Sequence, residues 1–236
     1  MTIDINFKFY SDSNGGDPDL KSPTLRKYHK FLWSKPLPNG RNFELFDDVN
    51  GSYLYNKSEV GEFYLGSDGI AHSYRNHKRK KFIIEKIPNE VAELFELCST
   101  VGGYIIFPNR KINGNQTINQ KRGVLKVIDD RFDLTLECIR RFYAGLQSPL
   151  HKTLIIYSSY FNLFDDFNGY IKHFFLQDLV DENHNIKFYL PFDDFKSSPV
   201  FSCVDDYLFY KEGVMKFVNH RNKRIEQYIK GIEYSE

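Results

Sequence analysis

The sequence predicts an α+β protein in which a small antiparallel sheet from the N-terminal half packs against a mainly helical C-terminal half. Short aromatic segments separated by Asn, Gly and Ser fill residues 42–74, which is typical of an antiparallel meander. Apolar residues recur at helical spacing through most of residues 132–229. We expect a single domain over residues 1–236, with a strand and loop at 1–20 and a frayed tail at 225–236.

The elements of the N-terminal half follow in order along the chain. Residues 5–10 alternate loosely and predict a strand, and residues 13–19 carry the turn residues of a loop. A helix begins at Ser22 and Pro23, because Ser caps a helix and Pro suits its first position. We then expect strands at 42–46, 52–56 and 61–68, a helix at 88–101, a buried strand at 104–108 and a long polar loop at 109–123.

The C-terminal half contains longer apolar patterns of helical period. They predict helices at 132–146, 154–164 and 167–179, a final strand at 187–195 and a long helix from about Asp205. Ser202 and Asp205 have the spacing of a capping box at the start of that last helix.

Composition excludes some classes of protein. The chain has 32 Lys and Arg against 31 Asp and Glu, so a general nucleic-acid coat or a polybasic membrane binder is not expected, although a local basic patch is allowed. The apolar runs are far shorter than the ~20 residues of a membrane span, and residues 1–10 do not resemble a secretory signal. Cys98, Cys138 and Cys203 each have apolar neighbours, which predicts buried free thiols and a cytoplasmic location.

The first candidate site is the basic helix that carries the only Trp of the chain. Arg26, His29 and Lys35 could surround an anion, because Arg recognises phosphate or carboxylate and His transfers protons near neutral pH. The alternative is an amphipathic helix whose Trp33 anchors it in the core.

Two further candidates are polar segments. The loop at 109–123 follows a predicted core strand and offers Arg110, Asn119 and Arg122 to a phosphate or nucleotide, although it lacks the spacing of a Walker loop. The basic run at 72–81 would suit nucleic-acid phosphates. For both segments a solvated connection is the alternative.

Carboxylates give the last candidates. Glu137 lies three and four residues before Arg140 and Arg141, so a partly buried Glu could position a substrate, or the three could form a structural ladder of ion pairs. Magnesium could bind where paired aspartates converge, although Asp is also common at turns and helix starts; the pairs begin at Asp47, Asp129, Asp165, Asp193 and Asp205. No sequence motif for zinc, for a Rossmann fold or for a serine hydrolase is found.

Five segments together resemble an uncharacterised bacterial family of unknown function. They are SPTLRKYHKFLWSKPLPNG, RFDLTLECIRRFY, SPL at 148–150, FNGYIKHFFLQDLV and FYLPFDDF. The resemblance extends from about Asp4 to Arg224 and implies a cytosolic bacterial protein with one domain. It transfers no activity and no catalytic residues.

Two functions therefore remain open. In the first, the protein binds or hydrolyses a phosphate-bearing ligand, a nucleotide or nucleic acid, in a cleft lined by Arg and His. Its catalytic residues would be His29 and Glu137, and its ligand-binding residues Arg26, Lys35, Arg110, Asn119, Arg122 and Arg140, with Asp193 as a further candidate. In the second, it is a non-catalytic module that binds a protein partner. Spatial convergence of these side chains would favour the first.

Overall fold

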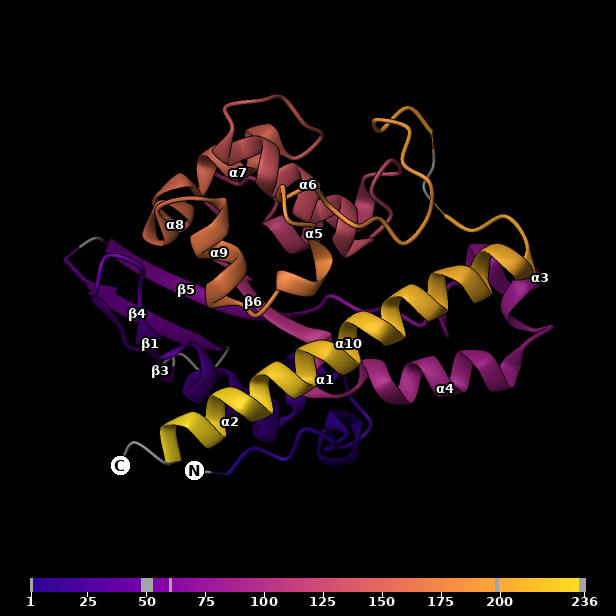
Figure 1. Ribbon diagram of the computed structural model, residues 1–236, viewed down its shortest axis with the longest axis horizontal. Helices are drawn as coiled ribbons and strands as arrows, with labels where there is room; N and C mark the ends of the chain where they lie inside the picture. Colours follow the sequence, from indigo (N-terminus) through magenta and orange to yellow (C-terminus); the bar gives the residue numbers. More distant parts are fainter. Residues whose placement is uncertain (1, 48–52, 60, 198–199, 234–236) are drawn as a thin grey trace.

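The structure, a computed structural model, describes residues 2–47, 53–59, 61–197 and 200–233. A four-stranded antiparallel sheet in the order β3-β4-β5-β6 lies within the N-terminal half, and a two-stranded hairpin, β1-β2, precedes it. The strand bounds are Lys35–Pro36, Asn42–Phe43, Phe46–Asp47, Leu54–Ser58, Gly61–Gly69 and Tyr104–Pro108 for β1 to β6. The α+β prediction is confirmed, with the sheet early in the chain and helices late (Figure 1).

The predicted meander is confirmed by the pairing of β4 with β5. Tyr55 pairs with Tyr64 and Leu54 with Leu65, and such cross-strand aromatic and aliphatic pairs stabilise a sheet. The long strand β5 then pairs with β6 along its second half, from Leu65 to Gly69. Ser52 and Asp48, which the sequence analysis placed in a strand and an acidic pair, lie outside the described residues.

The strand predicted at residues 5–10 is wrong. A 3₁₀-helix, η1 (Phe9–Asp12), occupies its second half, because Phe9 is fully buried and its N–H donates to the Ser99 carbonyl at 3.0 Å instead of to a strand. The predicted loop after it also contains a helical turn, α1 (Pro18–Lys21), whose first residues are held by the capping carboxylate of Asp17.

The helix predicted from Pro23 is confirmed as α2 (Pro23–Trp33). The Ser22 hydroxyl accepts a hydrogen bond from the Leu25 N–H at 3.0 Å and so caps it. Trp33 at its end has no exposed surface and contacts the rings of Phe174 and Phe175. The Trp therefore anchors α2 to the C-terminal half, as the amphipathic alternative predicted.

The chain between β5 and β6 forms a helical excursion. It consists of η2 (Lys78–Lys80), α3 (Lys81–Ile84), α4 (Pro88–Cys98) and η3 (Val101–Gly103). The helix predicted at 88–101 is confirmed but ends at Cys98, and the paired glycines Gly102 and Gly103 stand in the 3₁₀ turn that leads into β6.

The polar loop predicted at 109–123 is only half a loop. From Ile118 the chain forms α5 (Ile118–Val124), because Thr117 and Gln120 exchange two 3.3 Å hydrogen bonds in a capping box. This helix carries Asn119 and Arg122 into the structure on one rigid element.

The second half contains more breaks than the apolar patterns indicate. The helix predicted at 132–146 is confirmed as α6 but ends at Tyr143, and each of the next two predicted helices divides into shorter pieces. The bounds are Phe132–Tyr143 for α6, His151–Ile156 for α7, Ser158–Phe161 for α8, Asn162–Phe164 for η4, Phe167–His173 for α9 and Gln177–Leu179 for η5. Asp165 has a φ of 62°, so the chain turns there before Asp166 caps α9.

The final strand predicted at 187–195 is wrong. The Tyr189 N–H donates to the Asp133 carboxylate of α6 at 2.9 Å, and Phe188 stacks on Phe192. Asp194 and Phe195 have φ values of 62° and 61°, which a strand does not allow. The segment is therefore a loop held against α6.

The long C-terminal helix is confirmed as α10 (Val204–Glu233). The predicted capping box is wrong by one residue, since the Ser202 N–H and hydroxyl donate to Asp206 and not to Asp205. The helix also includes most of the predicted frayed tail, with Ile225 and Ile229 buried, while 234–236 lie outside the described residues.

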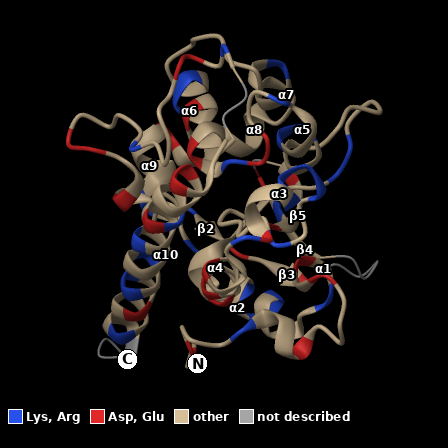
Figure 2. Ribbon diagram, turned by 90° about the vertical axis from the view of Figure 1, so that its right-hand side faces the viewer, with Lys and Arg blue, Asp and Glu red and all other residues tan. Residues whose placement is uncertain are grey.

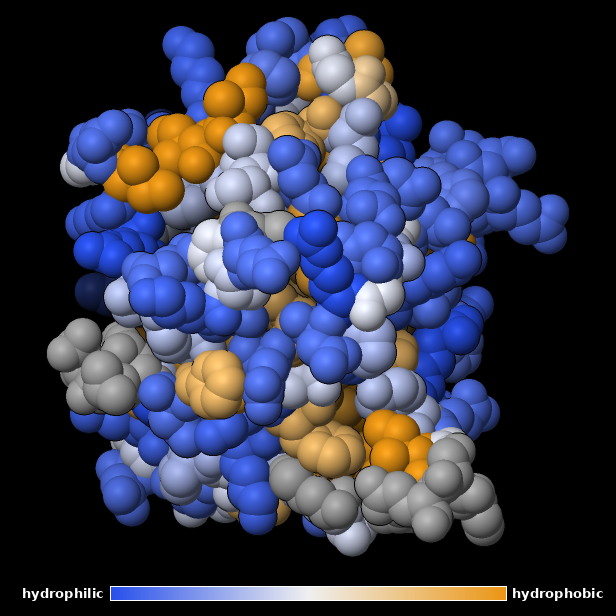
Figure 3. Space-filling model, turned by 90° about the vertical axis from the view of Figure 1, so that its left-hand side faces the viewer, coloured by the Kyte–Doolittle hydropathy of each residue, from blue (hydrophilic) through white to orange (hydrophobic). Residues whose placement is uncertain are grey.

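Helices cover the sheet from two directions. In Figure 1, α10 crosses the molecule beside α4, with which it packs, and α5 to α9 gather beside β5 and β6. On the face in Figure 3, hydrophobic residues form separate small groups among hydrophilic ones. Within the described residues, no helix is long and apolar enough to cross a membrane. Cys98 and Cys138 are buried, but Cys203 is exposed, which corrects the prediction that all three are buried.

Candidate functional site

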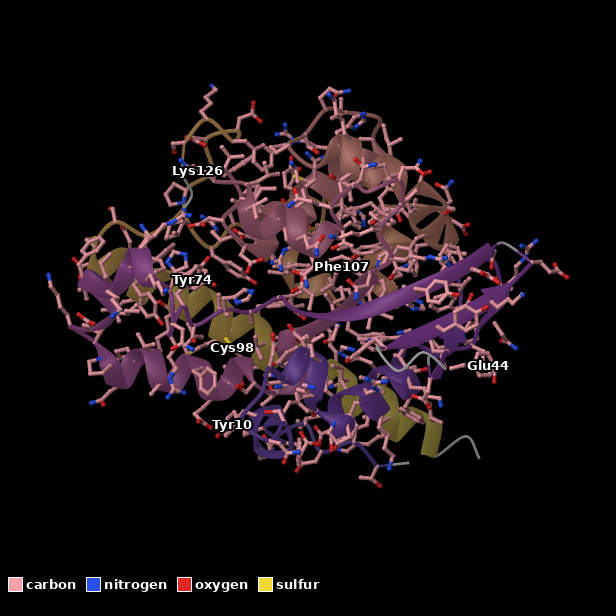
Figure 4. All side chains as sticks on the ribbon, turned by 180° about the vertical axis from the view of Figure 1, so that it is seen from behind. Tyr10, Glu44, Tyr74, Cys98, Phe107 and Lys126 are labelled. Atoms are coloured by element: carbon pink, nitrogen blue, oxygen red, sulfur yellow. The ribbon has the colours of Figure 1, made fainter. Side chains whose placement is uncertain are left out.

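A pocket of about 490 Å³ at the end of β5 gathers polar side chains from several parts of the chain. Six segments of the chain line it: α1, the chain after β5, α4, the start of β6, α5 and the turn before α6. Tyr74 and Cys98, both labelled in Figure 4, belong to this lining. Pockets in which a few polar groups converge from several elements are the usual place for a ligand.

Arg122 of α5 forms the floor beneath this pocket. Its guanidinium has no exposed surface and donates to the Asp68 carboxylate at 2.7 Å, the Gly69 carbonyl at 3.2 Å and the Thr135 hydroxyl at 3.1 Å. It also donates to the Asp130 carbonyl at 2.5 Å and lies 2.9 Å from the Asp130 carboxylate. One buried cation thus joins the end of β5 to the turn before α6.

The charges of Arg122 and Asp130 stabilise each other, whereas burial outweighs the charge of Arg122 at Asp68 and raises the pKa of that carboxyl group. Burial alone would lower the pKa of Arg122, but the negative charges of Asp130 and Asp68 outweigh it and raise that pKa, so the guanidinium stays protonated. Burial would likewise raise the pKa of Asp130, yet Arg122, His72 and His77 outweigh it and leave that pKa lowered. Asp130 is therefore an ionised carboxylate at neutral pH.

His72 lies over Asp130 at the bottom of the pocket. Its Nε2 atom is 3.3 Å from the Asp130 carboxylate, and a third of its side chain remains accessible from the pocket. Desolvation lowers the pKa of His72, and the neighbouring Asp130 opposes this only in part. At neutral pH the imidazole is thus mainly uncharged and able to accept a proton.

Asp19 of α1 supplies a second carboxyl group with the opposite behaviour. Its Oδ1 accepts a hydrogen bond from the Ser67 hydroxyl at 3.3 Å. Burial, together with the negative charge of Asp17, raises the pKa of Asp19 to about 7. The backbone of Gly69 acts on both groups, lowering the pKa of Asp19 and raising that of His72, so the two titratable groups share one backbone position.

The backbone around the pocket is strained. Tyr74, Asp129 and Asp130 have φ values of 58°, 45° and 66°, in the left-handed region that side chains other than Gly rarely adopt. The Tyr74 hydroxyl donates to the Asp129 carbonyl at 3.2 Å and so ties two of these positions together. Strain of this kind persists only where the surroundings enforce it, and it gathers at functional sites.

Basic side chains continue from the rim of the pocket. Arg75 lines the pocket mouth with its guanidinium 4.6 Å from the centre of the Phe95 ring, and the exposed Lys78 and Arg79 follow in η2. The basic run predicted at 72–81 therefore divides into a pocket floor at His72 and a solvated rim. Elsewhere, Lys and Arg positions spread over many elements and alternate with Asp and Glu along α10 (Figure 2).

His29, one of the two predicted catalytic residues, is a core residue. It has no exposed surface, it lies between the rings of Trp33 and Tyr53, and neither ring nitrogen has a hydrogen-bond partner within the described residues. Burial, and then the charge of Arg221, lowers the pKa of His29 to about 3. A neutral imidazole sealed in the core reaches no ligand in this conformation.

Glu137, the other predicted catalytic residue, is held by its own helix. Arg140 donates to it at 2.7 and 2.9 Å and Arg141 at 2.7 Å, and Arg141 also donates to Asp194 at 2.5 Å. The predicted ladder of ion pairs is present on α6, and it ties that helix to the loop that had been predicted as a strand.

The remaining predicted ligand residues lie in different places. Arg26 lies over the Tyr53 ring at 5.0 Å and Arg110 over the Tyr64 ring at 4.7 Å, while Asn119 is half-buried on α5. Lys35 lines a separate pocket of about 470 Å³. The predicted single cleft is thus divided: Arg122 belongs to the floor of the pocket at β5, and Lys35 faces another pocket.

Sequence reasoning missed most of the residues that build the pocket. Asp19 and Asp68 were not singled out, His72 was noted only as part of a basic run, and Asp130 only as one of several acidic pairs. The one local signal was the polar chemistry at the end of a predicted strand, where ligand groups often stand. Within the described residues, no three His, Cys, Asp or Glu side chains gather as metal ligands.

Comparisons with known proteins assign the chain to a family but indicate no function. Searches of curated proteins and of solved structures each find no match. A model described as a family of unknown function, DUF6994, matches residues 3–225. This match confirms the membership of a family of unknown function that the five sequence segments indicated from about Asp4 to Arg224. The chain therefore belongs to the family of unknown function DUF6994.

Proposed function

We propose that the pocket at the end of β5 is an acid–base active site for a phosphate-bearing polar ligand such as a nucleotide. The observation that carries the proposal is the pair of carboxyl groups, Asp19 and Asp130, whose pKa values are shifted in opposite directions beside one imidazole. Environments that separate the pKa values of neighbouring groups in this way are typical of acid–base catalysis.

The roles follow from the protonation states. Asp130 stays ionised and holds the His72 ring, which is uncharged near neutral pH and can accept a proton from the ligand or from water. Asp19 keeps its proton up to about pH 7 and can donate it to a leaving group. Arg122 does not bind the ligand, because its N–H donors already form hydrogen bonds to the protein. It acts as a positioning residue.

The charge distribution favours a ligand with two unlike ends. The pocket wall carries the carboxylates of Asp17 and Asp129, which suit hydroxyl or amino groups rather than phosphate. The basic rim at Arg75, Lys78 and Arg79 suits a phosphate group outside the pocket. A nucleotide whose sugar or base enters the pocket and whose phosphate lies on the rim satisfies both.

The test combines binding with turnover. Calorimetry with a panel of nucleotides and the matching nucleosides should show tighter binding of the nucleotide, and Arg75→Met should remove this preference. Product analysis by mass spectrometry should show turnover that falls above pH 7, where Asp19 loses its proton, and again at acidic pH, where His72 gains one. Asp19→Asn should retain binding and lose turnover.

Two results would overturn the proposal. One is that no member of the panel binds; the other is that a bound nucleotide is turned over equally by the protein and by its Asp19→Asn variant. The protein-interaction alternative would then be the better account. It draws on the exposed Phe209 of α10, which borders a groove of about 540 Å³.

A further inference from the structure

We infer that the second pocket, between β1 and α9, binds a small anion through Lys35 and His173. The pocket has a volume of about 470 Å³ and is lined by residues 35–38 at the end of α2 and start of the hairpin, and by residues of the α9 region. It shares no lining residue with the pocket at β5, so it constitutes a separate site.

The first observation is an unneutralised positive charge behind the pocket. Arg221 of α10 is fully buried, its guanidinium lies 5.7 Å from the centre of the Trp33 ring, and its charge reaches Lys35. Within the described residues, neither Lys35 nor Arg221 forms an ion pair with a carboxylate. Arg221 donates only to the carbonyls of Phe174, Gly102 and Tyr104. A buried cation without a counter-charge is costly, and a bound anion would offset that cost.

The second observation is a set of buried donors without partners. His173 lines the pocket with only 5% of its surface exposed, and its Nε2 atom has no hydrogen-bond partner within the described residues. Arg221 Nη2, Trp33 Nε1 and the Tyr170 hydroxyl are also unpartnered by the same measure, in the core and outside the pocket lining. Unsatisfied donors of this kind mark the place of a ligand, ion or water in a native fold.

The third observation is the setting of the Lys35 ammonium. It lies 3.8 Å from the centre of the Phe175 ring and 5.0 Å from that of Tyr228, which hold it in place by cation–π contact. Burial, and then the charge of Arg221, lowers the pKa of Lys35 to about 7. An anion would therefore bind most tightly at a pH at which the ammonium is protonated.

The acidic residues of the wall do not cancel this charge. Asp165 and Asp166 line the pocket, and the Asp166 carboxylate accepts the Gly169 N–H at 2.7 Å as the cap of α9. Lys172 on the same wall adds a further positive charge. Lys35 and Lys172 balance these two carboxylates, which leaves the buried charge of Arg221 without a counter-charge. The chemistry therefore suits a phosphate or carboxylate group attached to a small molecule.

The test uses inorganic phosphate and acetate as probes, at constant ionic strength and about pH 6, where Lys35 is protonated. Saturable stabilisation against heat by phosphate would assign the group as a phosphate, and saturation by acetate alone would assign it as a carboxylate; either supports the site. Lys35→Met should weaken binding of the effective probe by about tenfold or more, because a charged hydrogen bond is lost. Lys30→Met, a surface lysine of α2 that lines neither pocket, is the matched control and should bind unchanged.

A second measurement covers the case in which Lys35→Met fails to fold. In the unaltered protein, the ring nitrogen resonances of His173 should shift with the same saturation curve as the thermal stabilisation. The inference would be overturned if neither probe shows saturable binding, if the His173 ring does not respond, or if folded Lys35→Met binds the probe equally well.

Discussion

Replacing Arg122 by methionine removes the cation at the centre of the pocket floor and leaves two carboxylates without their partner. Asp68 has only 5% of its side chain exposed and depends on the 2.7 Å contact with Arg122. Breaking a buried ion pair by removal of one partner destabilises a protein by about 3–5 kcal/mol. The bonds to Gly69 and Thr135 are lost as well, and we expect a value near the middle of that range.

Urea unfolding at neutral pH measures the effect. Arg122→Met should lower the free energy of unfolding by about 4 kcal/mol, and the double variant Arg122→Met/Asp68→Asn should recover part of the loss because only the Asp130 carboxylate is then left without its partner. Lys30→Met is the control: Lys30 pairs with Asp47 on the surface, where 40% and 59% of the side chains are exposed, and its loss should change stability by less than about 1 kcal/mol. If Arg122→Met were as stable as Lys30→Met, Arg122 would not hold the pocket together.

Three further outcomes test other parts of the account. Asp19→Asn should stabilise the protein above pH 7 by up to about 4 kcal/mol, because a carboxyl whose pKa rises from 3.8 to about 7 on folding opposes folding when ionised; equal stability of both proteins at about pH 8 would contradict this. His29→Phe should be more stable than the parent by roughly 2–3 kcal/mol at about pH 4.5 in thermal unfolding, since His29, with a pKa of about 3, stays neutral in the fold while the unfolded chain takes up a proton below its ordinary value of 6.5. Thr117→Ala should lose about 1 kcal/mol of unfolding free energy with the capping box of α5, and no loss would mean that the cap is not formed in solution.

Local patterns predicted the elements whose stability is local. The helix from Pro23 carries its own cap and its own apolar stripe, and the meander carries alternating aromatic pairs, so the local sequence predicts both. The segments at 5–10 and 187–195 have strand-like composition, but distant partners decide their conformation. Phe9 finds the Ser99 carbonyl, and Tyr189 finds the Asp133 carboxylate. The residues near Phe9 and Tyr189 in the sequence do not indicate either contact.

The candidate site divides in the same way. Arg122 was predicted to bind a ligand because it follows a core strand, and it does stand at a pocket, but its role there depends on Asp68, which is 54 residues away in the sequence. His29 has the right chemistry for catalysis and the wrong environment, because its helix turns it into the core. Burial and long-range pairing decide the pKa values of a site, and single-residue patterns carry neither.

The most direct test of the acid–base pocket is an NMR titration of the Asp19 carboxyl carbon and the His72 ring in the unaltered protein. We predict that Asp19 titrates near pH 7 and that His72 titrates below its ordinary value of 6.5. An Asp19 carboxyl that titrates near its ordinary value of 3.8, with His72 protonated at neutral pH, would leave the pocket without an acid and without a base and would contradict the account.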